Sequence, residues 1–265
     1  MPYLYETHLH TCLASRCGRS TGKEHVRKYT DLGFTGIFMT DHFFGGNCAV
    51  DRDLPWPEKV KRFCAGFEDA WEEGQKTGLS VFFGWEQGYG DDEYLVYGLD
   101  KDWLLAHPEI ERCSRRRQLE LVHEGGGCVI QAHPFRFRAY NTYIRLGLRF
   151  CDGVEVANAG NLPVNDVYAW HFAHEYGLVM TAGSDNHDSS KVTSREELYG
   201  VSLSQKLTSA WDYADLILRR GEIGLHVPES RFAPLPEGTE PLVSYWLTEE
   251  ETLVPTGRSW ERASC

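Results

Sequence analysis

The sequence lacks any long apolar run and any excess of basic charge. No stretch of the 265 residues approaches the roughly 20 consecutive apolar residues that a membrane-spanning helix needs. Lysine and arginine together number 27 against 39 aspartates and glutamates, which gives a formal net charge of −12. A basic surface for nucleic acid is therefore absent, and neither a membrane partner nor an extended nucleic acid is expected.

The sequence also lacks repeats, low-complexity tracts and CxxC pairs. Its eight cysteines are scattered along the chain. The beginning of the sequence shows no basic region followed by an apolar run of the kind that directs secretion. We therefore expect reduced thiols and a cytoplasmic location, with most of the cysteines acting as small core residues.

Short apolar runs alternate with longer amphipathic stretches. Runs rich in Val, Ile and Phe predict buried strands at residues 33–42, 78–86, 126–134, 151–159 and 176–185. Helices are predicted at residues 21–33, 57–77, 115–125 and 163–176. Alternating strands and helices indicate an α/β fold with a parallel sheet, and one barrel domain spanning residues 1–265 suits this length. The acidic segment from about 234 to 265 is interpreted as a C-terminal tail packed on that domain.

Histidines and carboxylates gather where the predicted strands end. They are His8, His10, His42, Glu86, His133, Asp185 and His187. The carboxyl ends of parallel strands meet at one rim of a barrel, so these side chains should converge. Any one of them alone could be a structural residue, but together they match the imidazole and carboxylate ligands of zinc, manganese or iron. The remaining histidines fall on predicted helices or loops and are interpreted as structural.

The motifs that carry these residues resemble those of the PHP family, the polymerase and histidinol phosphatase domain. They are "THLHT" (7–11), "TDH" (40–42), "GWE" (84–86), "QAHP" (131–134) and "GSDNH" (183–187), in the order and approximate spacing of that family. The resemblance covers about residues 3–225. It implies a distorted (β/α)7, TIM-like barrel that binds two or three divalent metal ions (Zn, Mn or Fe) on its C-terminal rim.

The resemblance also implies which residues bind each ion. His8, His10, Glu86 and Asp185 would hold the first ion, Glu86 would bridge to a second ion that His133 also binds, and His42 and His187 would hold a third. The family usually adds a His, Asp or Glu to the third ion shortly after the HxH motif. This sequence has Cys17 there, which is either a thiolate ligand that favours zinc or a buried thiol beside the site.

A second departure follows Glu86, where the family often supplies a further histidine to the second ion. The segment "DDEYLVYG" (91–98) contains none. Asp91, Asp92 or Glu93 could replace the histidine, or the site could be more open.

Three further residues are candidates for catalytic roles. Arg136 follows His133 closely, and its guanidinium could clamp a phosphate, unless it is a surface charge on a loop. Asp41 could orient a metal ligand from behind. Asn158, at the end of a predicted strand, could contact substrate or water.

The function expected from this resemblance is a metal-dependent phosphoesterase. It would hydrolyse a small phosphorylated metabolite, such as histidinol phosphate or a nucleotide, by metal-activated water. One alternative is an amidohydrolase-like enzyme that cleaves C–N bonds, although the predicted strands contain no lysine of the kind that often bridges its ions. Another alternative is a non-catalytic metal-binding domain.

Overall fold

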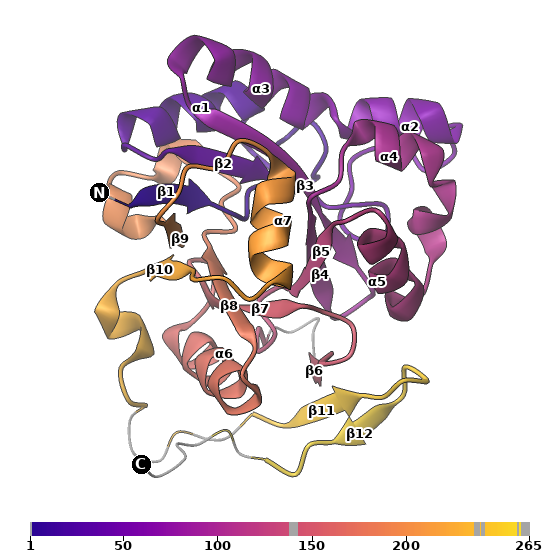
Figure 1. The fold of residues 1–265 in the computed structure, drawn as a ribbon, viewed down its shortest axis with the longest axis vertical. Helices are drawn as coiled ribbons and strands as arrows, with labels where there is room; N and C mark the ends of the chain where they lie inside the picture. The colour runs from indigo at the N-terminus through magenta and orange to yellow at the C-terminus, as the bar shows by residue number, and fades with distance from the viewer. Residues whose placement is uncertain (1, 138–142, 236–238, 240–241, 259, 261–265) are drawn as a thin grey trace.

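The main element of the structure is a nine-stranded sheet that curls into a nearly closed barrel with helices around it (Figure 1). The computed structural model describes the whole chain except residues 1, 138–142, 236–238, 240–241, 259 and 261–265. The strands are β1 Tyr3–Glu6, β2 Gly36–Met39, β3 Ser80–Gly88, β4 Glu93–Tyr97, β5 Cys128–Gln131, β7 Gly153–Asn158, β8 Val179–Gly183, β9 Gly200–Leu203 and β10 Gly224–His226. Their order is β10-β9-β1-β2-β3-β4-β5-β7-β8. The α/β, barrel-like prediction is thus confirmed.

Most of the sheet is parallel, but not all of it. β1, β2 and β3 pair in parallel, as do β5, β7 and β8. β4 is antiparallel to both of its neighbours, and β9 is antiparallel to β1 and β10. The expected parallel sheet therefore holds for the strands that were predicted, and the antiparallel strands β4 and β9 were not predicted. Residues 89–92, which link β3 to β4, are too few for the helical crossover that a parallel connection requires.

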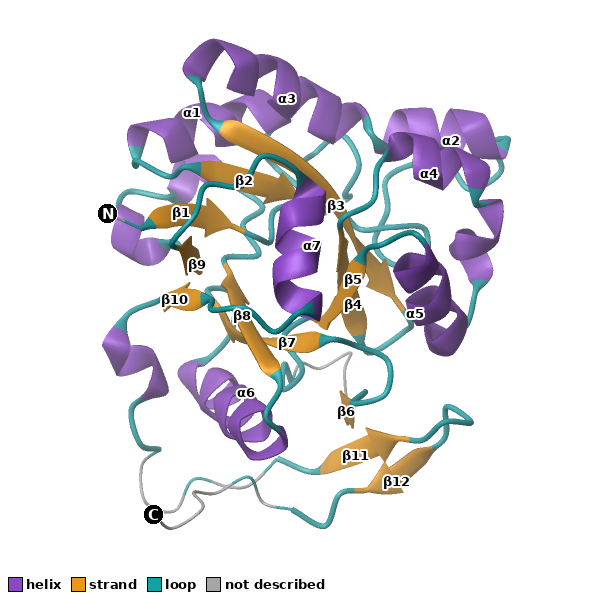
Figure 2. Cartoon of the chain, in the orientation of Figure 1, coloured by secondary structure: helices purple, strands orange, loops and turns teal. Residues whose placement is uncertain are grey.

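Most of the helices lie around the outside of the sheet, whereas α7 lies in the middle of the ring of strands, and one predicted helix is divided (Figure 2). They are α1 Gly22–Asp31, α2 Trp56–Phe63, α3 Ala65–Thr77, α4 Lys101–Ala106, α5 Arg115–Glu124, α6 Pro163–Tyr176 and α7 Ala210–Leu218, with 3-10 turns η1 Pro108–Arg112, η2 Ser189–Lys191, η3 Arg195–Glu197 and η4 Glu229–Phe232. The single helix predicted at 57–77 breaks at Cys64. The break allows α2 to pack on α4 while α3 packs along α1.

The C-terminal segment contributes to a second, smaller sheet. Its strands are β6 Ile144–Leu146, β11 Ser244–Leu247 and β12 Leu253–Pro255, in the order β12-β11-β6. β11 and β12 form a hairpin, and β11 pairs in parallel with β6. Trp246 lies against Phe172 and Tyr176 of α6. The segment interpreted as a tail therefore contains ordered strands that pack on the barrel.

The barrel core is rich in aromatic rings. Tyr213 of α7 meets Phe38 of β2 and Tyr97 of β4, with ring centroids 5.0 and 5.1 Å apart. All three rings are fully buried. Burying a large apolar side chain stabilises a fold by about 1.5–3 kcal/mol, so this cluster fixes the strands whose far ends carry the polar residues.

No helix of the described residues is both long and apolar enough to cross a bilayer.

We expect Gly22→Ala to destabilise the fold, because α1 and α3 approach each other closely at Gly22. A Cβ there would lie 2.4 Å from the carbonyl oxygen of Gly66 and 2.5 Å from the backbone nitrogen of Ala70. Alanine normally favours a helix over glycine by about 1 kcal/mol, but overpacking costs about 1–3 kcal/mol. Denaturant unfolding should therefore show a lower free energy of unfolding for the variant.

Gly46→Ala is the control for this substitution, since its Cβ would meet nothing nearer than 3.6 Å. A Gly22→Ala protein as stable as the wild type would contradict the tight packing of α1 on α3.

We also expect one surface pair to make stability depend on pH. The Nε2 atom of His123 on α5 donates a hydrogen bond to Asp152, at 2.9 Å, and this bond raises the pKa of His123. The pair therefore stabilises the fold below the usual histidine pKa of about 6.5, and this contribution is lost as the pH rises through the raised value. Because the pair is partly exposed, its contribution should stay below about 1 kcal/mol.

The measurement is the free energy of unfolding of the wild type and of His123→Gln at about pH 5.5 and about pH 9, on either side of that pKa. The variant should be less stable than the wild type only at the lower pH. An equal difference at both values would show that the protonated imidazole contributes nothing.

Candidate metal centre

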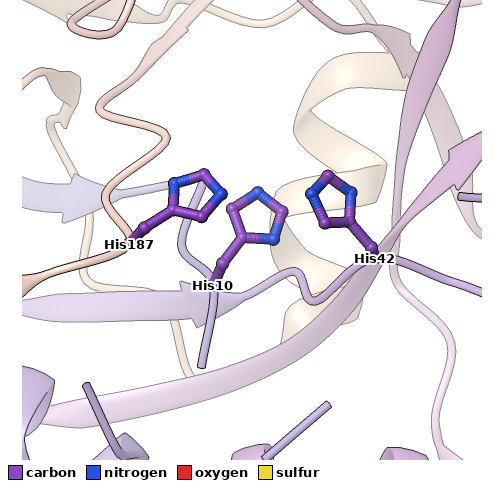
Figure 3. A group of neighbouring side chains, drawn as sticks. All are labelled: His10, His42 and His187. Atoms are coloured by element: carbon purple, nitrogen blue, oxygen red, sulfur yellow. The ribbon is translucent and has the colours of Figure 1, made fainter. Parts of the chain in front are cut away.

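The residues expected to bind metal all converge at the carboxyl ends of the parallel strands. They follow or end β1, β2, β3, β5 and β8, and they are His8, His10, His42, Glu86, His133, Asp185 and His187. Their possible ligand atoms form overlapping groups in which all atoms lie within 4.8 Å of one another. Figure 3 shows the rings of His10, His42 and His187 side by side, carried by three separate segments.

The spacing between ligand atoms fits a bound ion. In a tetrahedral site with bonds of about 2.0–2.1 Å, neighbouring ligand atoms lie roughly 3.4 Å apart. The Nε2 atoms of His8 and His10 are 3.1 Å apart, and each also faces Oδ1 of Asp185, at 3.5 and 2.9 Å. Nε2 of His8 lies 3.2 Å from Oε1 of Glu86. These four side chains therefore point at a common position.

Two buried atoms in the cluster face each other without a hydrogen bond. Nδ1 of His42 and Oε2 of Glu86 lie 2.6 Å apart, yet neither makes a hydrogen bond within the described residues. Leaving a buried donor or acceptor unpaired costs about 1–3 kcal/mol, and more for a charged group. A divalent ion between such atoms would remove that cost, so the residues present fit a metal.

The carboxylates of the cluster stay ionised in spite of their burial. Burial pushes the pKa of Glu86 upward, but the charges of His8 and His42 outweigh it and hold that pKa well below its usual range. Burial acts on Asp185 in the same way, and Arg136 and His8 hold its pKa well below the usual range. Both side chains are therefore available as anionic ligands.

Glu155 is a functional candidate that sequence reasoning missed. This fully buried residue of β7 accepts a hydrogen bond from Nδ1 of His8, at 2.9 Å, and one from the backbone nitrogen of His133, at 3.0 Å. A carboxylate behind a ligating histidine fixes the tautomer and orientation of the ring. The available signal was a lone acidic residue inside the apolar strand "GVEVAN", since a buried charge requires a partner.

Asp41 lies behind the cluster, where it can orient a ligand. Its carboxylate accepts hydrogen bonds from the Ser15 hydroxyl and the Thr11 backbone nitrogen, both at 2.6 Å. The Ser15 oxygen in turn lies 3.3 Å from Nδ1 of His10 and accepts a 2.9 Å bond from the backbone nitrogen of His42. Asp41 thus contacts His10 through Ser15, which supports the expected orienting role.

Cys17 faces the pair of histidines that would hold a third ion. Its half-buried thiol is hydrogen-bonded to His187 and His42. Burial raises the pKa of the thiol, but these bonds and the nearby histidine charges lower it overall to about 6. The position of Cys17 is consistent with a thiolate ligand, and the choice between that reading and a buried thiol beside the site requires a test.

Glu93, the last of the three consecutive acidic residues after Glu86, faces two histidines of the cluster. Asp91 pairs with Arg145 and Asp92 with Arg115, each at 2.5 Å. The Glu93 carboxylate instead lies 3.5 Å from Nε2 of His133 and 3.8 Å from Nδ1 of His42. Glu93 therefore lies where the resemblance to the PHP family implies a further ligand of a second ion.

Arg136 is not the exposed loop charge that was one reading of the sequence, because its side chain is only 11% exposed. It donates hydrogen bonds of 2.7 Å to Asp185, Asn158 and Asn161. Asn158 is fully buried and also donates to Glu155, at 2.9 Å. It does not line the cavity described next, so the structure favours a supporting role for Asn158 over the expected contact with substrate.

The cluster opens into a cavity of about 500 Å³. Its wall includes Cys17, His42, Asn47, Gly90, Asp91, Glu93, His133, Arg136, Gly160, Asp185 and His187. This volume lies within the range of small-molecule sites. Among the described lining residues the only permanent cation is Arg136, so a bound anion would depend strongly on metal ions for charge compensation.

Several solved structures share this fold. A candidate metal-dependent phosphoesterase from Bifidobacterium adolescentis matches with 18% identity and a TM-score of 0.52, over 82% of this chain and 96% of that one. A two-domain protein from Bacteroides vulgatus, which contains a predicted PHP-like metal-dependent phosphoesterase, matches with 15% identity and a TM-score of 0.63, over 86% of this chain and 65% of that one. The chain therefore has the PHP-like barrel fold that its motifs implied.

Proteins with other named activities share the fold as well. Endonuclease Q, solved with a 27-mer duplex that carries an abasic lesion, matches with 10% identity and a TM-score of 0.53, over 84% of this chain and 58% of that one. An amidohydrolase from Chromobacterium violaceum matches with 14% identity and a TM-score of 0.50, over 80% of this chain and 96% of that one. No family model and no curated protein matches the sequence. The fold alone therefore does not specify a substrate.

We expect Glu93→Gln to weaken metal binding, because it removes the anionic group that faces His133 and His42. Loss of groups that support a metal site typically lowers affinity by about 10–100-fold, and loss of a ligand should cost at least as much. Zinc titration of the metal-free protein against a competing chelator measures the change.

Glu93→His is the matched variant, since it restores an imidazole ligand of the kind the PHP family often has there, and it should retain most of the affinity. Glu93→Gln protein that binds every equivalent of zinc as tightly as the wild type would exclude Glu93 from the metal centre.

Proposed function

We propose that this protein is a metal-dependent phosphoesterase that hydrolyses a small phosphorylated metabolite. The observation that carries the proposal is the position of Glu86. Its two oxygens face different partners, with Oε1 at 3.2 Å from both His8 and His133 and Oε2 at 2.6 Å from His42. A carboxylate shared in this way can bridge two ions, and paired ions stabilise both the attacking and the leaving oxygen in phosphoryl transfer.

The side chains would divide the work between binding ions and binding substrate. When bound, divalent ions would supply a Lewis acid for the phosphoryl oxygens and would lower the pKa of water. His8, His10 and Asp185 would hold a first position together with Glu86. Glu155 and Asp41 would keep the imidazoles of His8 and His10 in the orientation for binding. These residues leave the open side of the cavity to the substrate.

Arg136 is proposed to act on the substrate side. Its guanidinium lies on the cavity wall and binds Asp185, so it both holds that carboxylate and places positive charge next to the bound phosphate. A planar guanidinium suits bidentate recognition of phosphate oxygens. The role of Arg136 as a phosphate clamp thus remains a proposal that its position supports.

The donor set supports zinc, manganese or iron, in two or three positions. Imidazoles and carboxylates suit all three metals, whereas a thiolate favours zinc. The third position would use His42, His187 and Cys17, and it therefore depends on Cys17 being a ligand.

The size of the cavity supports a small phosphomonoester, such as a nucleotide or histidinol phosphate, as the substrate. Its volume of about 500 Å³ suits one metabolite, and its wall carries the carboxylates of Asp91, Glu93 and Asp185. The net charge of −12 disfavours a long polyanion. Because Endonuclease Q shares the fold, an abasic DNA duplex belongs in the substrate test.

Hydrolysis of C–N bonds is the second candidate, favoured by the amidohydrolase that shares the fold. In that class a modified lysine often bridges the ions. No strand among the described residues contains lysine, and Glu86 occupies the bridging position. A non-catalytic role is the third candidate. It is disfavoured because an acid or imidazole is present at every ligand position except that of Cys17.

We expect Asp185→Asn to abolish most of the activity, because it removes a charge that faces both His8 and His10. A loss of about 100-fold or more in kcat is expected with a chromogenic phosphomonoester in the presence of zinc or manganese, since a ligand that acts in the transition state is removed. The same protein should be assayed on a phosphodiester, an amide and an abasic duplex.

Asp188→Asn serves as the control. Asp188 lies in the same loop as Asp185, but its carboxylate accepts a hydrogen bond from Ser190 and does not face the cluster. The substitution should therefore leave the rate unchanged. Full phosphatase activity in Asp185→Asn would overturn the metal assignment, and cleavage of the amide alone would establish the C–N hydrolase.

A further inference from the structure

The loop between β3 and β4 forms part of the cavity wall, and two arginines hold it from outside, Arg145 through Asp91 and Arg115 through Asp92. Gly90 and Asp91 of this loop, residues 89–92, line the cavity, and Glu93 follows directly. Arg115, at the start of α5, donates to both carboxylate oxygens of Asp92, at 2.8 and 2.5 Å, and to the carbonyl oxygen of Tyr89, at 3.1 Å. Its guanidinium also lies 4.6 Å from the centre of the Tyr89 ring. Arg115 therefore contacts both ends of the loop.

The same guanidinium extends to the C-terminal hairpin. Its Nη1 atom donates to Glu251 at 2.7 Å, and Glu251 lies in the turn between β11 and β12. Glu251 has a φ of +56°, and its backbone nitrogen donates to Thr248 at 2.9 Å. Left-handed backbone costs a non-glycine residue of this kind roughly 1 kcal/mol or more, and it persists when surrounding contacts favour it. The ion pair with Arg115 is such a contact.

We propose that the β11–β12 hairpin helps to position a ligand of the metal centre. Glu251 is a positioning residue that acts through Arg115 to hold the loop at residues 89–92 and, with it, the carboxylate of Glu93. This inference rests on the proposed function only in taking the cluster to bind metal. It assigns a role in the site to a segment whose sequence, far from every metal motif, indicated only a tail.

The physical basis is that the side chains of Arg115 and Asp92 have little contact with solvent. The side chains of Arg115 and Asp92 are 11% and 4% exposed, so the guanidinium has little water to replace a lost partner. Without Glu251, one edge of Arg115 would have to turn toward solvent, and its bonds to Asp92 and Tyr89 would weaken. Glu93 directly follows the loop and contacts His133 and His42 at 3.5 and 3.8 Å, so a shift of the loop should move its carboxylate.

The test compares Glu251→Gln with Glu249→Gln. Glu249 lies in the same turn and has the same charge, but it pairs with Arg149 and Arg116, which do not hold the loop. Hydrogen exchange of the metal-free proteins, followed by mass spectrometry, reports on peptides covering residues 89–94. Zinc titration of the same proteins reports the affinity of the most weakly bound equivalent.

Glu251→Gln should raise exchange in the loop several-fold and weaken the last zinc equivalent by about tenfold, the effect of replacing a hydrogen bond between two charged groups by one to a neutral amide. Glu249→Gln should change neither. Equal behaviour of the two variants, even with a shared loss of thermal stability, would overturn the proposal and leave the hairpin a purely structural element.

If the wild type bound no zinc, the proposed function would fail, yet the exchange of the loop would still decide whether Glu251 positions it. Faster exchange in Glu251→Gln alone would support the positioning claim, and unchanged exchange would overturn it.

Discussion

The arrangement of the cluster depends on the burial of two ionised carboxylates, those of Glu86 and Asp185. An isolated carboxylate in a protein interior is so costly that it would normally become protonated. Glu86 and Asp185 remain ionised because imidazoles and one guanidinium surround them. That arrangement needs side chains from strands far apart in sequence, and it needs them at the same end. The curled sheet meets this requirement, since its parallel strands deliver their carboxyl ends to a single rim.

Support for the cluster is arranged in successive layers. Glu155 and the Asp41–Ser15 pair hold the imidazoles, and Arg136 holds Asp185. Farther out, Arg115 holds the loop that precedes Glu93. Each layer uses charge-assisted hydrogen bonds in places with little solvent, where such bonds are strong. The result is a set of candidate ligands held by hydrogen bonds beside an open cavity, an arrangement that suits the proposed hydrolysis of a small substrate.

Much of this arrangement could be predicted from the sequence, because short apolar runs that end in a polar residue mark both a strand and its direction. The start of the helix predicted at residues 21–33 could be predicted for the same local reason, and the structure has a capping box there between Thr21 and Glu24. The break at Cys64 and the C-terminal hairpin depend on tertiary packing, which no local pattern records. Asp91, Asp92 and Glu93 look alike in sequence, and only the distant arginines that pair with the first two single out Glu93.

The central claim is that the cluster binds metal, and elemental analysis of the purified protein beside a Cys17→Ala variant tests it most directly. We predict about three equivalents of zinc, manganese or iron per chain, because the donor groups would form three positions if Cys17 is a ligand, and a loss of about one equivalent in the variant. An unchanged content of about two equivalents would limit the centre to two ions and remove Cys17 from it. No metal above background, even after reconstitution with each of the three ions, would contradict the account.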